Sequence, residues 1–146
     1  ILRYPEFYKV AVSSAGNHDN RNYADDWGEK WQGLLETYSE TNTTNGDGEV
    51  ATSYDNQANQ LLVEKLEGKL LLAHGMMDTN VHPTSTMLVV EALIEAEKDF
   101  DLLMLPNAGH RFGNSRYFMK RRWDYFVEHL QNIDPPVGFT FADNIQ

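Results

Sequence analysis

Three short apolar runs, separated by segments with helical periodicity, constrain the fold of this chain most strongly. The runs occupy residues 9–14 (KVAVSS), 69–73 (KLLLA) and 100–105 (FDLLML). Nearly continuous apolar runs of this length are typical of strands that are buried on both faces, as in a parallel sheet. Strands that alternate with helices along a chain predict an α/β fold.

The segments after the second and third runs repeat apolar residues at the spacing of amphipathic helices, over residues 85–97 and 115–130. The side chains expected to face the sheet are Met87, Val90, Leu93 and Ile94 in the first helix and Phe118, Tyr125 and Phe126 in the second. A shorter helix is predicted around residues 56–66. The polar segment 41–48 contains an N-glycosylation pattern at Asn42, which we interpret as an unmodified exposed loop.

Length and charge narrow the classes of function. The 146 residues are enough for one domain with its own core. The net charge of −10 argues against a nucleic-acid partner, because phosphate binding depends on clustered Lys and Arg. No apolar stretch approaches the roughly 18 residues of a membrane span. The chain has no cysteine and therefore neither a disulfide framework nor a thiol nucleophile.

Two polar residues follow the second and third strands at positions that suggest catalysis. Asp78 comes a few residues after the second strand, and His110 directly follows the third. In open α/β sheets, reactive groups collect on loops at the carboxyl ends of the strands. In α/β hydrolases the triad runs Ser, acid, His along the chain, and the later two positions match Asp78 and His110. We therefore predict that Asp78 orients the imidazole of His110, which acts as general base.

The loops around these residues carry a family resemblance. The segment HGMMDTNVHP resembles the loop that carries the catalytic Asp in the prolyl oligopeptidase family of serine peptidases, and LPNAGHRF resembles the loop with its catalytic His. The segment FYKVAVSSAGNHDNRNYADDWGEKWQG is similar to the strand and aromatic segment of the family's dipeptidyl peptidase IV branch. The resemblance implies the C-terminal portion of an α/β-hydrolase fold, with parallel strands alternating with helices.

The resemblance also implies roles for single residues. Asp78 and His110 match the acid and the base of the triad, and Asn80 matches an asparagine that binds the carbonyl oxygen of the substrate. Tyr23, Trp27 and Val81 match the wall of a hydrophobic pocket for proline or alanine. Trp27 departs from the tyrosine usual in the mammalian-type enzymes, which leaves the width of that pocket open. The implied activity is hydrolysis of peptide bonds after proline or alanine near the N-terminus of a peptide, without a cofactor.

The nucleophile of such a triad is missing from the sequence. A nucleophile elbow requires Gly-x-Ser-x-Gly, and no serine here has that pattern. Ser14 comes nearest, with Gly16 two residues later, but Val12 stands in place of the first glycine and only one strand separates Ser14 from Asp78. We therefore expect that residues 1–146 form a partial catalytic domain, which lacks the elbow and an N-terminal β-propeller, and that the isolated chain is inactive.

Other classes of function stay open. An acylaminoacyl peptidase or an esterase uses the same triad, and a non-catalytic interaction domain can share the fold. A metal site could draw on the five histidines, but their spacing disfavours it; they are His18, His74, His82, His110 and His129. The expected partners are a peptide substrate and further copies of the chain, since the first strand would leave an unpaired edge. The resemblance suggests a periplasmic or extracytoplasmic location.

Overall fold

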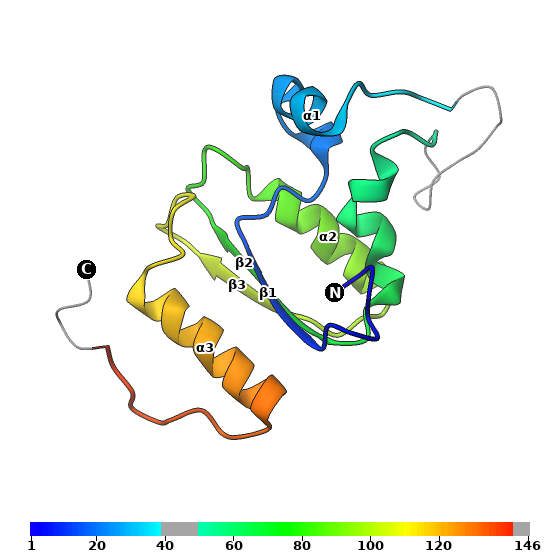
Figure 1. The fold of residues 1–146 in the computed structure, drawn as a ribbon. Coiled ribbons are helices and arrows are strands. Elements are labelled where there is room, and N and C mark those ends of the chain that lie inside the picture. The colour runs from blue at the N-terminus through cyan, green and yellow to red at the C-terminus, as the bar shows by residue number, and fades with distance from the viewer. Residues whose placement is uncertain (39–49, 142–146) are drawn as a thin grey trace.

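The computed structural model describes residues 1–38 and 50–141, which form a three-stranded parallel sheet flanked by helices (Figure 1). The elements in chain order are β1 (Val10–Ser14), η1 (Asn20–Asn22), α1 (Asp25–Gln32), η3 (Asp55–Gln57), η4 (Asn59–Lys65), β2 (Lys69–Gly75), α2 (Thr84–Glu95), β3 (Asp101–Leu105) and α3 (Arg116–Gln131). All three predicted strands are confirmed. The strand order is β1-β2-β3, and β2 continues two residues further than its apolar run.

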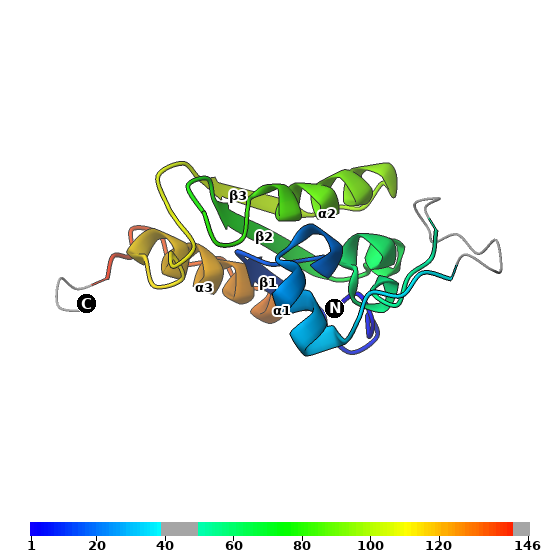
Figure 2. The same cartoon turned by 90° about the horizontal axis from the view of Figure 1, so that it is seen from above.

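Helices cover both faces of the sheet (Figures 1 and 2). Helix α3 lies on one face, and α2 lies on the other beside η4. The central strand β2 is buried almost throughout, so its alternate side chains contribute to two separate cores. Leu70 and Leu72 join a cluster with Val89 and Leu93, whereas Ala73 joins a second cluster with Phe112 and Phe118. This double burial explains why the run has no polar alternation.

Helix α2 turns a different stripe toward the sheet than the one expected. Its buried residues are Ser85, Thr86, Val89 and Leu93, while Ile94 is 58% exposed, so the prediction for Ile94 was wrong. The buried stripe follows a spacing of four residues, and each next residue along a helix is turned by about 100°. Ile94 therefore points away from the core that holds Leu93.

Helix α3 matches its prediction closely. The hydroxyl of Ser115 caps the helix by accepting a hydrogen bond from the backbone N–H of Phe118, and Asn132 ends the helix in the left-handed conformation. Phe118 and Tyr125 are buried and Phe126 is half-buried. The helix thus lies against the face of the sheet that carries Ala73.

The excursion between β1 and β2 is built from short elements. The helix expected around residues 56–66 is replaced by the 3₁₀ helices η3 and η4. The guanidinium of Arg21 forms ion pairs with the carboxylates of Asp19 and Asp55, at 2.7 Å and 3.1 Å, and thereby ties the start of the excursion to its end. The glycosylation pattern at Asn42 lies outside the described residues.

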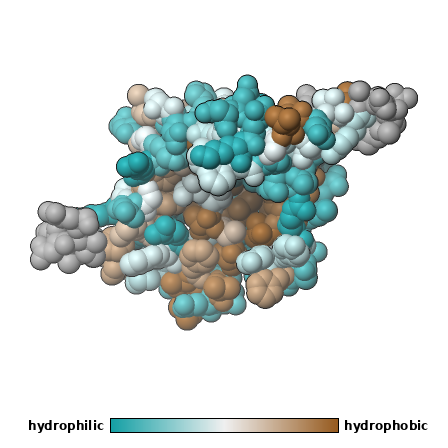
Figure 3. All heavy atoms as spheres, turned by 45° about the horizontal axis from the view of Figure 1, so that its top comes forward, coloured by the Kyte–Doolittle hydropathy of each residue, from teal (hydrophilic) through white to brown (hydrophobic). Residues whose placement is uncertain are grey.

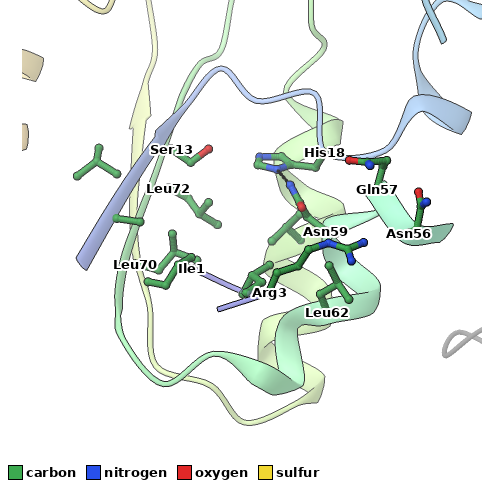
Figure 4. A pocket seen from close by; sticks show the side chains of 14 residues that line it. Ile1, Arg3, Ser13, His18, Asn56, Gln57, Asn59, Leu62, Leu70 and Leu72 are labelled. Carbon is green, nitrogen blue, oxygen red and sulfur yellow. Dashed lines mark hydrogen bonds between the residues drawn. The ribbon is translucent and has the colours of Figure 1, made fainter. Parts of the chain in front are cut away.

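Strand β1 forms one edge of the sheet. Within residues 1–38 and 50–141 it pairs only with β2, so part of its backbone faces away from any partner strand. Hydrophobic residues gather in the centre and lower part of the face shown in Figure 3. Beside β1 lies a hollow of about 360 Å³ with a floor that includes Leu70 and Leu72, into which His18 and Ser13 point (Figure 4).

None of the helices in the described part of the chain has the length and apolar character of a membrane span. The longest is α3, with 16 residues.

Candidate catalytic site

A tight turn after β2 presents Asp78. Its backbone N–H donates to the carbonyl of Gly75 at 3.1 Å. Its carboxylate oxygen Oδ1 accepts hydrogen bonds from the backbone N–H groups of Asn80 and Val81, at 2.9 Å and 3.0 Å. An aspartate that binds the backbone two residues ahead fixes a turn in this way. The carboxylate is consequently buried, with 0% exposure of the side chain, and held in one orientation.

The loop after β3 brings His110 to the same carboxylate. The Nδ1 atom of His110 lies 2.8 Å from Oδ2 of Asp78, so the two residues predicted to form an acid-base pair are in hydrogen-bond contact. Phe112, two residues after His110, is buried and makes an edge-to-face contact with Phe118 of α3, at 4.9 Å between ring centroids. This contact anchors the loop of His110 to α3.

Hydrogen bonding decides the charge state of Asp78. Burial alone would raise its pKa, but the hydrogen bonds from His110 and from the backbone N–H groups of Asn80 and Val81 outweigh burial. They hold the pKa of Asp78 below the ordinary value for an aspartate, so the group is ionised at neutral pH. Ionised Asp78 requires a proton on Nδ1 of His110, which leaves Nε2 as the nitrogen that can accept one.

The His110 side chain is 35% exposed and lines an open hollow together with Ser14, Asn80 and Arg111. Nε2 of His110 has no hydrogen-bond partner among the described residues, and neither does the amide nitrogen of the Asn80 side chain. The hollow therefore offers a ligand a proton acceptor, Nε2 of His110, and a hydrogen-bond donor, the side-chain amide of Asn80. This is the arrangement needed to take a proton from a nucleophile and to bind a carbonyl oxygen.

The predicted pocket wall is only partly assembled around this hollow. The hydroxyl of Tyr23 donates to Oδ1 of Asn80 at 2.9 Å, and the Tyr23 ring meets Trp27 edge to face, at 6.2 Å between centroids. Tyr23, Trp27 and Asn80 therefore form one contiguous group. Val81 is buried beneath the Asp78 turn, and neither Val81 nor the two aromatic residues lines the hollow beside His110.

Ser14 shares the hollow with His110, but no hydrogen bond connects the two residues in the described part of the chain. Ser14 ends β1, which pairs directly with β2, whereas the triad order places a strand between the nucleophile strand and the strand before the acid. Ala15 follows with a positive φ of 48°, so the chain turns sharply there. Ser14, the alternative nucleophile, thus lies near His110, but it is on the strand directly adjacent to β2 and not one strand further away.

The histidines do not gather into a metal centre within residues 1–38 and 50–141. His18 pairs with the side chain of Asn59 at 2.9 Å. Burial, with a smaller contribution from nearby His74, lowers the pKa of His18 to about 4. His74 contacts Asp78, a role that the sequence analysis missed, and only its position four residues before Asp78 at a strand end could have signalled it.

A glycine allows the loops of Asp78 and His110 to meet. A methyl group on Gly75 would lie 2.3 Å from the backbone carbonyl oxygen of Ala108, two residues before His110. The backbone N–H of Met77 donates to this same carbonyl at 3.0 Å. The absence of a side chain at Gly75 is therefore what lets the loop of His110 approach the turn of Asp78.

We expect Gly75→Ala to destabilise the chain by about 1–3 kcal/mol, because the loop of His110 must move to admit the methyl group. Urea unfolding of the 146-residue chain measures this change. Gly113→Ala is the matched control, since no atom lies within 4 Å of the added methyl group, and its effect should stay within about 1 kcal/mol. Equal stabilities of the two variants would contradict the close approach of the loops.

Comparison with known proteins gives a consistent identification. The sequence pattern of the prolyl oligopeptidase family matches residues 1–133. "Dipeptidyl peptidase family member 1" of Caenorhabditis elegans is 27% identical over 131 residues, which cover 88% of this chain and 14% of that protein.

Two solved structures share the fold. One is a Bacteroides ovatus protein assigned as a dipeptidyl aminopeptidase IV, with a TM-score of 0.71 and 25% identity over 88% of this chain and 17% of that chain. The other is dipeptidyl peptidase 4 of Porphyromonas gingivalis, with a TM-score of 0.64 and 28% identity over 84% of this chain and 16% of that chain. The predicted α/β-hydrolase class is thereby confirmed, and the chain spans about one sixth of these structures.

The match covers the loops of Asp78 and His110 and all three strands of the described sheet. The chain therefore belongs to the prolyl oligopeptidase family.

Proposed function

We propose that this chain is the C-terminal portion of the catalytic domain of a longer serine exopeptidase of the dipeptidyl peptidase IV type, called the parent below. The observation that carries the proposal is the hydrogen bond of 2.8 Å between Nδ1 of His110 and Oδ2 of buried, ionised Asp78. In this proposal the rest of the parent contributes the nucleophilic serine and the oxyanion-hole donors, and this chain contributes the acid, Asp78, and the base, His110.

Each group has a defined step in the proposed reaction. Nε2 of His110 takes the proton of the serine hydroxyl while the serine oxygen attacks the scissile carbonyl carbon, and then gives that proton to the leaving amine. Asp78 stabilises the imidazolium that exists between these two transfers. A water molecule then attacks the acyl-enzyme, again with His110 as base, and releases the serine. The Asn80 side chain is proposed to donate a hydrogen bond to a substrate carbonyl oxygen.

A comparison of substrates tests this proposal against its alternatives. We expect the parent to cleave Gly-Pro-p-nitroanilide and Ala-Pro-p-nitroanilide, which release p-nitroaniline, faster than N-acetyl-alanine-p-nitroanilide or a simple p-nitrophenyl ester, which releases p-nitrophenol. Faster cleavage of the acetylated substrate would favour an acylaminoacyl peptidase, and faster ester cleavage an esterase. No turnover of any of them would favour a non-catalytic domain.

The exposed edge and the hollow beside β1 support the view that further chain packs here. Backbone groups of β1 that face away from β2 have no strand partner among the described residues, and the adjoining hollow has an apolar floor. Unpaired edges and exposed apolar surface are normally covered in soluble proteins. We propose that another segment of the parent covers them in the full-length protein.

In the isolated chain the same surface should cause self-association. We expect size-exclusion chromatography with multi-angle light scattering to give a mass above the monomer's 16.7 kDa. A lysine on an edge strand opposes strand pairing, so Val10→Lys should shift the distribution toward monomer. Val137→Lys, at a fully exposed site in the C-terminal segment, is the control and should change nothing. A strictly monomeric wild-type chain would contradict the expectation.

We further propose that Tyr23, Trp27 and Val81 form the wall of the pocket for proline or alanine. An aromatic wall holds a small rigid ring without desolvating a polar group. Trp27→Ala in the parent should raise KM for Gly-Pro substrates, with a loss of about 1–3 kcal/mol in discrimination. Trp123→Ala is the control, because Trp123 has a similar exposure, 49% against 51% for Trp27, and lies on α3. An unchanged preference in Trp27→Ala would refute the assignment.

A further inference from the structure

His74 is a fully buried polar side chain at the end of β2 that the proposed reaction does not use. Its exposure is 0%, and both ring nitrogens have partners. Nδ1 lies 2.7 Å from the hydroxyl oxygen of Thr86. Nε2 lies 2.9 Å from the carbonyl oxygen of Val81 and 3.2 Å from Oδ2 of Asp78. The ring is therefore held from both sides and directly contacts the proposed catalytic acid.

The partners define the tautomer of His74. The carbonyl of Val81 and the ionised carboxylate of Asp78 can only accept hydrogen bonds, so Nε2 must carry a proton. The hydroxyl of Thr86 can donate, so it can satisfy an unprotonated Nδ1. A neutral ring with the proton on Nε2 therefore fits these partners: Nε2 donates to the carbonyl of Val81, and Oδ2 of Asp78 lies 3.2 Å from the same nitrogen.

The contact with His74 adds to three hydrogen bonds that already hold the carboxylate of Asp78. Oδ1 accepts from the backbone N–H groups of Asn80 and Val81, and Oδ2 accepts from His110 and lies 3.2 Å from Nε2 of His74. A carboxylate has about four acceptor sites, so the three hydrogen bonds leave one site, and the proton on Nε2 of His74 lies close to it. Together these contacts restrict the plane of the buried carboxylate, and with it the direction from Oδ2 to His110.

We propose that His74 is a positioning residue of the site: its Nε2–H group holds Oδ2 of Asp78 in the orientation in which Oδ2 accepts the hydrogen bond from Nδ1 of His110. The consequence for catalysis rests on the proposed peptidase function. The contact between His74 and Asp78, and its effect on the orientation of Asp78, do not depend on that function. The positioning role and the peptidase function can therefore fail separately.

Two substitutions separate this role from simple packing. The side-chain amide nitrogen of Gln reaches the place of Nε2 of histidine, whereas that of Asn reaches only the place of Nδ1. His74→Gln therefore keeps a donor toward Asp78, and His74→Asn, which is shorter by one methylene group, loses it while remaining polar. If His74 only filled space, both variants would weaken the His110 signal, because both side chains are smaller than histidine.

The readout is the proton on Nδ1 of His110, observed by NMR in the 146-residue chain. A proton hydrogen-bonded to a carboxylate resonates at low field, and Asp78→Asn identifies the signal by abolishing it. We expect the signal to persist in His74→Gln and to move upfield or broaden by exchange with water in His74→Asn, with unchanged far-ultraviolet circular dichroism in both. An unchanged signal in folded His74→Asn would overturn the proposal.

A measurement on the unmodified chain keeps the test decisive if a variant fails to fold. Long-range ¹H–¹⁵N correlation of the imidazole rings reports which nitrogen carries the proton. We expect the proton of His74 on Nε2, and a proton on Nδ1 alone would overturn the proposal, because Nε2 could then donate to nothing.

In the parent, His74→Asn should lower kcat roughly 10-fold or more with little change in KM, as loss of an orienting partner does at comparable sites. His74→Gln should restore most of it.

If the parent proves inactive while these signals appear as expected, the proposed function fails and the positioning role stands. If the parent is active and His74→Asn lowers neither kcat nor the His110 signal, the positioning role fails and the proposed function stands.

Discussion

Replacement of Asp78 by Asn in the parent is expected to lower kcat by about 10⁴-fold with little change in fold. The amide oxygen of Asn can still accept the backbone N–H groups of Asn80 and Val81, so the turn after β2 can persist. The amide nitrogen would face Nδ1 of His110 as a donor. Nδ1 would then have to accept, which moves the ring proton to Nε2, the atom that must take the serine proton.

Replacement of His110 by Ala should lower kcat by a similar factor, because no other group in the described hollow can accept a proton at neutral pH. The measurement is steady-state turnover of Gly-Pro-p-nitroanilide by the parent, with circular dichroism as a check on folding. Asp99→Asn, before β3 at the opposite end of the sheet, and His129→Ala, near the end of α3, are the controls. Turnover near normal in Asp78→Asn or in His110→Ala would remove the proposed roles.

The isolated chain is expected to hydrolyse no peptide substrate at a rate typical of a triad enzyme. An acid-base pair without a nucleophile cannot form the covalent intermediate, and without an oxyanion hole it cannot stabilise the tetrahedral one. Loss of the triad and of the oxyanion hole together removes many orders of magnitude in rate. The test is incubation of the purified chain with Gly-Pro-p-nitroanilide, with the parent as the positive control.

Ser14 is the one serine of the hollow beside His110, and it could contradict this expectation. If the isolated chain shows turnover that a serine-directed phosphonate inhibits and that Ser14→Ala abolishes, then Ser14 is a nucleophile. Ser13→Ala is the matched control, since Ser13 precedes it on β1 and points into the hollow on the α2 side (Figure 4). Absence of turnover in wild type and both variants is the expected result.

The sequence predicts those parts of the fold whose signal is local. The run KLLLA predicts β2, because a strand that is buried on both faces does not alternate polar and apolar residues. Ser115 indicates the start of α3, because its hydroxyl caps the helix. The face of α2 was predicted only in part: Leu93 is buried as expected, but Ile94 is exposed and Val89 is buried in its stead. Val89 and Ile94 are both apolar, and only the position of the sheet decides which of them is buried.

The site depends on contacts that local patterns cannot show. Strand order suggests that Asp78 and His110 share one end of the sheet, but their contact needs Gly75, where the backbone of Ala108 comes close. His74 was considered only as a metal ligand, because a histidine at a strand end gives no local sign that it faces a carboxylate. The location of the protein outside the cytoplasm, suggested by the resemblance, stays a prediction.

Mapping of the nucleophile in the parent tests the central claim most directly. The parent is labelled with a fluorophosphonate, digested, and analysed by mass spectrometry to locate the modified serine, and the labelling rate is measured in wild type and in His110→Ala. We predict that the modified serine lies outside the 146 residues of this chain and that the labelling rate falls steeply in His110→Ala. A modified serine within these residues, or a labelling rate indifferent to His110→Ala, would contradict the claim that this chain supplies the acid and the base to a nucleophile carried elsewhere in the parent.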